Sequence, residues 1–313
     1  MLELTGLRKR FGNVIALDDC SLRAEPGRML GFLGPNGSGK TTAMRSIFGL
    51  IHLDAGRVHW RSRPISSDEH RRFGYMPEQR GLYPRMRIRE QIVYFARLHG
   101  RSATEAAHAA DHWLDRLGLA ERAGSRLEEL SHGNQQRVQL IVAIAHDADL
   151  LVLDEPFAGL DPIGVESLGE LVREQAARGA AVLFSSHQLD LVEDLCDDIT
   201  IIHRGRTVLD GPLADVRAAS PSRYIHASVA PRGLGSGQPW HAALAGLELL
   251  WSRNNESRLR VPVDTDPAAL LAAAQAAGDV VFFRFEPPLL SDLFMEAVNE
   301  RPEALLASEA AMP

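Results

Sequence analysis

The chain has 313 residues, which is long enough for two domains of ordinary size. Of these residues 45% are hydrophobic and 24% charged, so we expect a packed globular core. The formal net charge of −7 argues against a nucleic-acid partner held by phosphate neutralisation. Two cysteines, Cys20 and Cys196, without a CxxC pair exclude a disulfide framework and a cysteine-based zinc site. No run of about 18 apolar residues occurs, so we expect a soluble chain that reaches a membrane only through a partner.

Strand-like and helix-like segments alternate along the first two thirds of the chain. The predicted strands cover residues 3–10, 21–24, 29–34, 57–65, 150–154 and 180–186. The predicted helices cover residues 41–50, 87–119, 163–178 and 189–196, and a further helix follows residues 130–137. The runs at 150–154 and 180–186 are apolar up to their polar last residues, which is typical of buried parallel strands. This alternation predicts an α/β fold with a parallel sheet.

Composition changes after about Ala219, because residues 220–240 are rich in proline, glycine and serine. We therefore predict one domain over residues 1–219 and a second over residues 220–313. The second shows a hairpin that turns near Asn254 and Asn255, followed by a helix, a strand and a final helix. This order predicts a small α+β domain of ferredoxin-like character.

Residues 34–41 read GPNGSGKT and match the phosphate-binding pattern GxxxxGK[ST], between a predicted strand and a predicted helix. Glycine permits the backbone conformations in which successive N–H groups converge on a phosphate. Lys40 places a positive charge on the β- and γ-phosphates, and the Thr41 hydroxyl is a predicted Mg²⁺ ligand. The predicted nucleotide contacts in this segment are Gly34, Pro35, Asn36, Gly37, Ser38, Gly39, Lys40, Thr41 and Thr42.

Residues 150–156 read LLVLDEP, an apolar strand that ends in two carboxylates. Asp154 is predicted to hold Mg²⁺, directly or through water. Glu155, one residue further, is placed to accept a proton from the attacking water or to orient it. Alone, such an acidic pair favours a solvated turn, and the phosphate-binding loop is what makes it an expected partner.

Three further side chains are candidates for the same site. His187 follows a predicted buried strand and can reach the γ-phosphate and the attacking water. Gln79 carries an amide that can contact Mg²⁺ or water from a loop. Phe11 is either an aromatic platform for an adenine ring or a core residue, and the sequence leaves both open.

Residues 130–137 read LSHGNQQR and directly precede an apolar run. Ser131 is well suited to cap the N–H groups of a helix start. The same helix start can also face a phosphate, because helix N-termini bind anions. Alone, the segment favours the cap.

These segments, in this order, resemble the motifs of the ATP-binding subunits of ABC transporters over about residues 2–215. The matches are Phe11 to the A-loop, GPNGSGKT to Walker A, Gln79 to the Q-loop, LSHGNQQR to the signature, LLVLDEP to Walker B, AGLD at residues 158–161 to the D-loop, and His187 to the H-loop. Residues 77–86 and 285–298 resemble the exporter branch that includes drug- and sodium-efflux ATPases.

The resemblance implies a P-loop ATPase fold with a mixed sheet core, an antiparallel β subdomain and a helical subdomain. It implies ATP and Mg²⁺ as cofactors, with Glu155, His187, Lys40 and Gln79 catalytic and with Thr41, Gln79 and Asp154 at the metal. It further implies a homodimer in which Ser131 and the Gly133 N–H bind the γ-phosphate in trans, while Asp161 lies at the dimer seam. The implied partner is an integral membrane permease at the cytoplasmic face of the membrane, docked near residues 79–94, where Tyr83, Pro84 and Met86 are candidates.

The signature departs from the usual LSGGQ, because His132 replaces a glycine and Asn134 replaces the glutamine. We expect function to survive if the backbone at residue 132 needs no positive φ. Two other functions stay open: a soluble ABC ATPase of DNA repair or translation, and a nucleotide-sensing module without catalysis. The C-terminal domain is equally compatible with a regulatory role, with dimer contacts and with a purely stabilising role.

Overall fold

The computed structural model describes residues 1–79, 81–231, 240–241 and 247–299. The chain divides into two compact units, of which the larger contains Met1–Leu213 and the smaller Ala214–Glu296. Composition predicts the division a few residues later, after Ala219. Within the part of this segment that the structure describes, residues Ser222–Pro231 form a strand, which their composition does not predict.

An antiparallel sheet opens the larger unit, with the strand order β2-β1-β4-β5. Its strands are β1 (Leu2–Phe11), β2 (Val14–Ala24), β4 (Ala55–Trp60) and β5 (Arg63–Pro64). The strand predicted over residues 57–65 is split into β4 and β5, since Arg61 and Ser62 have φ values of 51° and 63° and turn the chain. This sheet confirms the β-rich start that the sequence predicts.

The second sheet of this unit has the order β10-β9-β3-β8-β7-β6. Its strands are β3 (Met29–Leu33), β6 (Phe73–Met76), β7 (Leu150–Asp154), β8 (Ala181–Ser185), β9 (Asp198–His203) and β10 (Arg206–Pro212). All neighbouring pairs are parallel except β9 with β10. Strands β3, β7 and β8 are buried along their whole length, as their continuous apolar sequences predict.

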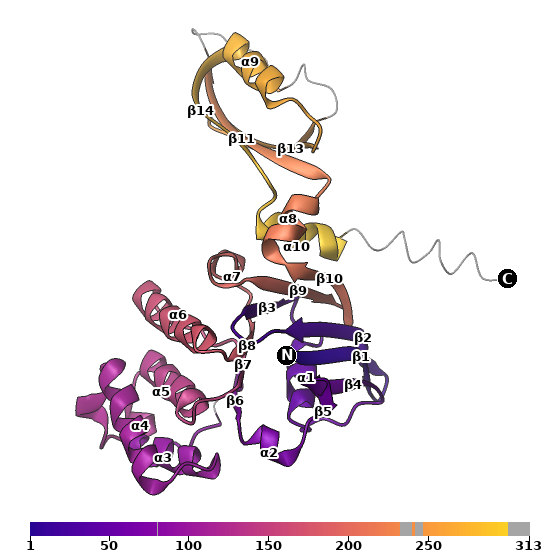
Figure 1. Ribbon diagram of the computed structural model, residues 1–313. Helices are drawn as coiled ribbons and strands as arrows, with labels where there is room; N and C mark the ends of the chain where they lie inside the picture. The colour runs from indigo at the N-terminus through magenta and orange to yellow at the C-terminus, as the bar shows by residue number, and fades with distance from the viewer. Residues whose placement is uncertain (80, 232–239, 242–246, 300–313) are drawn as a thin grey trace, which may run out of the picture. The chain divides into compact units, whose positions relative to one another are not determined.

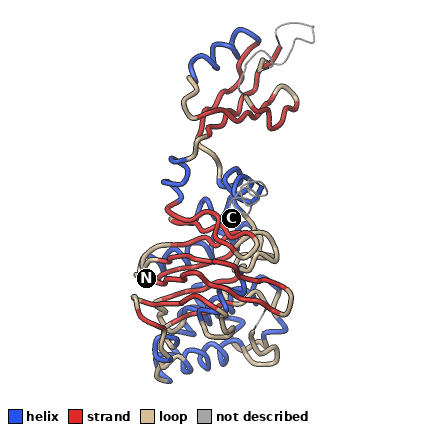
Figure 2. Tube along the Cα trace, turned by 90° about the vertical axis from the view of Figure 1, so that its right-hand side faces the viewer, coloured by secondary structure: helices blue, strands red, loops and turns tan. Residues whose placement is uncertain are grey.

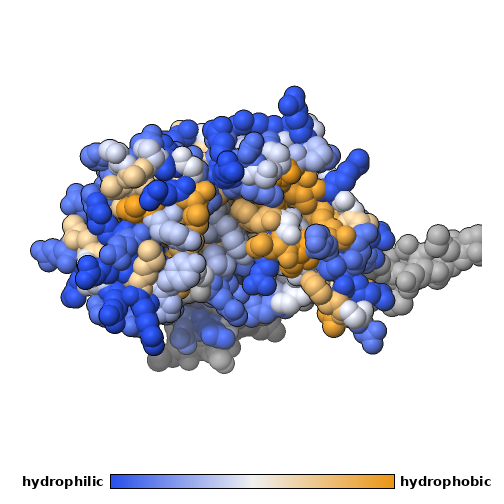
Figure 3. Space-filling view, turned by 90° about the horizontal axis from the view of Figure 1, so that it is seen from below, coloured by the Kyte–Doolittle hydropathy of each residue, from blue (hydrophilic) through white to orange (hydrophobic). Residues whose placement is uncertain are grey.

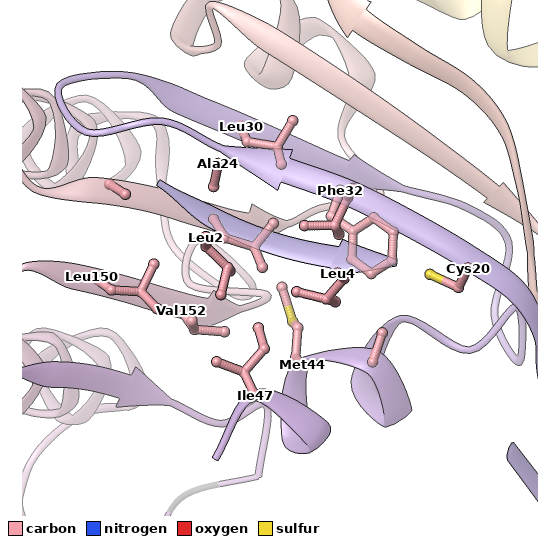
Figure 4. Packing of buried hydrophobic residues seen from close by; sticks show 14 of the residues in the cluster. Leu2, Leu4, Cys20, Ala24, Leu30, Phe32, Met44, Ile47, Leu150 and Val152 are labelled. Carbon is pink, nitrogen blue, oxygen red and sulfur yellow. The ribbon is translucent and has the colours of Figure 1, made fainter. Parts of the chain in front are cut away.

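The main core lies between these two sheets, with helix α1 (Lys40–Ile47) packed into it. Figure 4 shows Met44 and Ile47 of α1 pointing toward Leu4 of the antiparallel sheet and Val152 of the parallel sheet. All four side chains are almost fully buried. Burial of this kind stabilises by about 25 cal/mol per Å² of apolar surface, so α1 is fixed on both sides.

The larger unit contains further helices and 3₁₀ turns. They are α2 (Ser67–His70), α3 (Ile88–Leu98), α4 (Ala103–Arg116), the 3₁₀ turns η1 (Ala120–Arg122) and η2 (Leu127–Glu129), α5 (His132–Ile144), α6 (Pro162–Ala177) and α7 (Leu189–Leu195). Helices α5 and α6 lie on the face of the sheet opposite α1 (Figure 1). The helical stretch predicted over 87–119 is interrupted, because Gly100 has φ 94° and Ser102 begins α4 with a capping box to Glu105.

The smaller unit contains an antiparallel sheet of order β12-β13-β11-β14. Its elements are α8 (Leu213–Ala219), β11 (Ser222–Pro231), β12 (Glu248–Arg253), β13 (Glu256–Pro262), α9 (Pro267–Ala277), β14 (Gly278–Glu286) and α10 (Leu290–Asn299). Figure 2 shows α9 alongside the strands of this sheet. Asn254 and Asn255, with φ 48° and 69°, make the predicted hairpin turn. Most of the connection from β11 to β12 lies outside the described residues, so a ferredoxin-like topology stays a prediction.

His146, just beyond α5, is a buried titratable group of the larger unit. Only 6% of its surface is exposed, and its ring stacks on that of His99 with 3.8 Å between centroids. Burial lowers the pKa of His146 to about 3, because the interior disfavours the imidazolium. In the unfolded chain the same group takes up a proton near pH 6.5, so the folded state loses stability as the pH falls below that value.

We predict that His146→Phe makes the stability of the protein less sensitive to acid. The phenyl ring keeps an aromatic side chain beside His99 and binds no proton. Between pH 7 and pH 5 the free energy of unfolding of the wild type should fall by about 2 kcal/mol through His146 alone. Urea unfolding at both pH values measures the difference, with the exposed His52→Gln as control. Equal pH dependence in all three proteins would contradict the assignment.

Candidate active site

The loop between β3 and α1 requires glycine for geometric reasons. Gly37 and Gly39 have φ values of 77° and 110°, which side chains rarely tolerate. A Cβ on Gly39 would lie 2.4 Å from the Ala16 carbonyl oxygen, and one on Gly34 would lie 2.3 Å from that of Ile202. The loop therefore passes too close to the neighbouring backbone for any larger residue, and it leads directly into the N-terminus of α1, where anions are favoured.

Lys40 and Ser38 give this loop the polar groups of a phosphate cradle. The Lys40 ammonium donates to the Gly34 carbonyl at 2.6 Å and to the Pro35 carbonyl at 3.3 Å. Burial lowers its pKa, and the carboxylates of Glu155, Asp154 and Glu78 oppose that shift. The Ser38 hydroxyl is buried and has no hydrogen-bond partner among the described residues. An unpaired buried hydroxyl beside an ammonium and a helix N-terminus fits a phosphate group.

Asp154 ends β7 and meets Thr41 of α1, although 113 residues separate them in the chain. The Thr41 hydroxyl donates to Asp154 Oδ2 at 2.9 Å. No group of three or more His, Cys, Asp or Glu side chains in the described part of the chain forms a complete metal cage. Mg²⁺ commonly takes one or two protein oxygens and completes its shell with phosphates and water. The Thr41–Asp154 pair therefore fits Mg²⁺ bound together with a nucleotide.

Glu155 adopts an unusual backbone conformation that directs its side chain. Its φ is 53°, in the left-handed region, which costs about 1–2 kcal/mol for a residue with a Cβ. Its N–H donates to the Ser185 hydroxyl at 2.9 Å, and Gln136 of α5 donates to its carbonyl at 3.3 Å. In this conformation Glu155 Oε2 lies 2.9 Å from Nδ1 of His187, which follows β8. The two predicted catalytic side chains are thus in direct contact.

A pocket of about 400 Å³ joins these elements. It is lined by Val14, Ile15, Ala16, Asn36, Gly37, Ser38, Gly39, Lys40, Thr41, Thr42, Glu78, Asp154 and Glu155. Most of the predicted nucleotide and metal residues therefore share one cavity. Gly34 and Pro35 do not line it, and their carbonyls accept hydrogen bonds from Lys40. His187 does not line the cavity, but its ring contacts Glu155, which does.

Two groups of lining residues are absent from the sequence-based prediction. Val14 and Ile15 expose 66% and 49% of their surface at the start of β2, and exposed apolar side chains at a pocket suit the flat face of a base. Glu78 lines the pocket from the loop after β6, whereas its neighbour Gln79 is exposed and does not line it. A signal existed for Glu78, since it is a carboxylate directly beside Gln79 in the same loop.

Phe11 ends β1 opposite Val14 in the register of the β1–β2 hairpin. It is 48% exposed, so the core role that the sequence left open does not apply. Lys9 lies over its ring, with 5.3 Å from the ammonium to the centroid. Phe11 is not among the residues that line the pocket, and an adenine contact through it stays a prediction.

Ser131, Gly133 and Asp161 do not line this pocket in the same chain. Ser131 is the N-cap of α5, where its hydroxyl accepts the Asn134 N–H at 3.4 Å. His132 begins the α-helix, so the departure from glycine needs no positive φ, and its ring lies against Gly159. Asp161 caps α6 by accepting the Gly164 N–H at 2.7 Å. The cap role of Ser131 is therefore confirmed, and neither Ser131, Gly133 nor Asp161 lines the pocket.

Several known proteins have sequences similar to this chain. A family model described as ABC transporter matches residues 17–158. The chain is 37% identical over 302 residues to the uncharacterized ABC transporter ATP-binding protein YhaQ of Bacillus subtilis, which covers 96% of this chain and 99% of that protein. It is 36% identical over 214 residues to the Nod factor export ATP-binding protein I of Burkholderia lata, with 67% of this chain and 70% of that protein covered.

A solved structure gives the same result at the level of the fold. The structure described as an ATP binding subunit of an ABC transporter aligns with a TM-score of 0.65 and 32% sequence identity, and the alignment covers 70% of this chain and 92% of that chain. The predicted α/β fold of an ABC-type ATPase is thereby confirmed. The phosphate-binding loop, the Asp154–Glu155 pair and the full-length similarity lead to one conclusion: this chain belongs to the ABC transporter family, as an ATP-binding subunit.

Proposed function

We propose that this chain is the Mg²⁺-dependent ATPase of an ABC exporter and drives efflux through a separate integral membrane permease. The observation that carries the proposal is the contact of Glu155 with His187 at the pocket formed by Lys40, Thr41 and Asp154. ABC ATP-binding subunits as a group bind and hydrolyse ATP, and this chain retains the side chains for both. Export is favoured over import by its similarity to proteins named for Nod factor export.

Each side chain of the site has a separate role in the proposed hydrolysis. Thr41 and Asp154 would hold Mg²⁺, which neutralises charge on the β- and γ-phosphate oxygens when bound. Lys40 exchanges its present carbonyl partners for phosphate oxygens, which form stronger, charge-assisted hydrogen bonds. Glu155 accepts a proton from the attacking water, and His187 holds the carboxylate in place from 2.9 Å.

Dimerisation is the part of the proposal that gives the signature a role. Ser131 is exposed, and it lies outside the pocket of its own chain. In a head-to-tail homodimer, the N-terminus of α5 in one protomer would face the γ-phosphate held by the other. A charge-stabilising group supplied in this way is worth about 10³ to 10⁵ in rate in related phosphoryl transfer.

The permease has a candidate docking surface near the loop after β6. A cavity of about 310 Å³ is lined mostly by apolar side chains, among them Phe48, Leu82 and Phe95. Gln139 also lines it, and its Oε1 is buried without a hydrogen-bond partner among the described residues. Tyr83 and Tyr94 are 52% and 42% exposed nearby and pack edge to face. Figure 3 shows apolar side chains gathered on the face of the molecule that carries α2 and α3.

An amphipathic helix from a partner suits such a surface, because apolar grooves with a few unpaired polar groups bind helices of that kind. Among the described residues, no helix has both the length and the apolar character to cross a bilayer. In this proposal the permease holds the chain at the cytoplasmic face of the membrane.

We predict that Glu155→Gln binds ATP but hydrolyses it at least about 100-fold more slowly, because an amide cannot accept the proton. With ATP and Mg²⁺ the variant should accumulate as a closed dimer. Phosphate release and analytical ultracentrifugation measure the two effects. A wild-type rate in this variant would show that Glu155 is not the catalytic carboxylate.

The Glu155→Gln variant can also be used to test whether Ser131 of the signature takes part in dimer closure. Adding Ser131→Ala should lower the dimer fraction in ATP and leave ATP binding to the monomer unchanged. Ser102→Ala is the matched control, since Ser102 is also an exposed serine that caps a helix, here α4. If both alanine variants lower the dimer fraction equally, Ser131 acts only as a helix cap.

The neighbours Glu78 and Gln79 give a further test, because the structure places only Glu78 at the pocket. We predict that Glu78→Ala lowers kcat by about tenfold or more, since it removes a charged group beside Lys40. Gln79→Ala should change kcat by less than about twofold in the isolated chain. Phosphate release at saturating ATP and Mg²⁺ measures kcat of both variants. A larger fall in kcat for Gln79→Ala than for Glu78→Ala would show that Gln79 is the catalytic residue of this pair.

We predict that Tyr83→Asp combined with Tyr94→Asp reduces permease retention by about tenfold, because burying two carboxylates in an apolar contact is unfavourable. The test co-expresses the tagged chain with any polytopic protein that a neighbouring reading frame encodes, and measures how much of that protein is recovered with the chain in detergent. Val281→Asp, at a residue that is 70% exposed in the smaller unit, is the control. ATP binding should be unchanged in all variants. Equal recovery with the double variant would place the docking surface elsewhere.

A further inference from the structure

Ser185 stands between the two carboxylate residues of the site. It is the last residue of β8 and pairs directly with Asp154 in the parallel register of β7 and β8. Its hydroxyl donates to Asp154 Oδ1 at 2.7 Å and accepts the Glu155 N–H at 2.9 Å. The side chain is fully buried, so water does not compete for these bonds. One hydroxyl thereby touches both residues.

The direction of each hydrogen bond is fixed by chemistry. The Glu155 backbone N–H can only donate, and a hydroxyl has a single proton. The Ser185 proton is therefore committed to Asp154. With Oδ1 held by Ser185, Asp154 presents Oδ2 to Thr41 at 2.9 Å, which is the pair assigned to Mg²⁺. Partners of metal ligands commonly act in this way, by fixing the orientation of the ligand.

The second bond acts on the backbone of Glu155. Its left-handed φ of 53° is unfavourable for a residue with a side chain, and such conformations persist only where the surroundings hold them. Ser185 binds the amide, and Gln136 binds the carbonyl of the same residue. In this conformation the carboxylate meets His187. Loss of the Ser185 hydroxyl would free the amide and, with it, the direction of the carboxylate.

The adjacent Ser186 shows that burial alone does not give this role. It is 3% exposed, yet its hydroxyl accepts the Gln188 N–H at 3.0 Å in a local turn. The hydrogen bonds of the described residues link it to neither Asp154 nor Glu155. Ser186 is therefore a matched control, identical in residue type and next in the chain.

We propose that Ser185 is a positioning residue that sets the metal-binding carboxylate and the catalytic carboxylate at once. The inference rests on the proposed ATPase function. It assigns to β8 a role beyond carrying His187: the hydroxyl at its end couples metal binding to the orientation of the base. Removing that hydroxyl should weaken Mg²⁺ binding and hydrolysis together, while nucleotide binding without metal is spared.

The test compares Ser185→Ala, Ser185→Thr and Ser186→Ala in the full chain. Phosphate release is measured across a Mg²⁺ titration, and binding of a fluorescent ATP analogue is measured with Mg²⁺ and with EDTA. For Ser185→Ala we expect kcat to fall and the half-saturating Mg²⁺ concentration to rise, each by about 10-fold to 100-fold. Binding in EDTA should stay within about twofold of wild type. Ser186→Ala should match wild type, and Ser185→Thr, which keeps a hydroxyl, should recover most of the Mg²⁺ response.

Two results would overturn the assignment of Ser185. One is an unchanged Mg²⁺ response in Ser185→Ala. The other is an equal loss in Ser186→Ala, which would indicate a general effect of cavities at this strand end, and thermal unfolding of each variant identifies such an effect. Failure of the proposed function is a separate outcome, because it appears as a wild-type chain that releases no phosphate. In that event the Mg²⁺ dependence of nucleotide binding still decides the role of Ser185.

Discussion

Parallel pairing of β3, β8 and β7 is the constraint on which the site depends. In the register, Phe32 pairs with Ser185 and Ser185 pairs with Asp154, so the three strands end at the same edge of the sheet. The segment that follows each strand must then leave at that edge, which is where open α/β sheets bind ligands. This arrangement is why residues as far apart as Thr41 and Asp154 form a hydrogen bond without any local sequence relation.

The phosphate-binding loop is held at this edge from two sides. Its Ser38 carbonyl accepts the N–H of Gly205 in the β9–β10 turn at 2.9 Å, and the Gly205 carbonyl in turn accepts the N–H of Asp18 in β2. Gly39 meanwhile passes close to the Ala16 carbonyl. The loop thus links both sheets, and glycine is needed because a Cβ would push them apart. Packing of α1 in the core completes the restraint, so the helix N-terminus cannot move away from the phosphate position.

The sequence predicts those features that depend on local geometry. Glycine spacing, apolar runs and capping residues are local properties, and they identify the loop, the buried strands and the Ser131 cap correctly. Features that depend on register or on the direction of a loop are not predictable in this way. Ser185 reads as part of a buried strand, and its partner is known only once β7 lies beside β8. The choice between Glu78 and Gln79 depends on how the chain turns after β6, which no periodicity reveals.

Charge at the helix N-termini fits the two-chain site of the proposed dimer. Among the α-helices that the structure describes, only α1 and α5 begin with neither a carboxylate cap nor an acidic residue in the first turn. A helix N-terminus carries about half a positive charge, so an anion there is stabilising. For α1 that anion would be a phosphate in the pocket of its own chain. The N-terminus of α5 does not line that pocket, and in the proposed head-to-tail dimer it would meet the phosphate held by the second protomer.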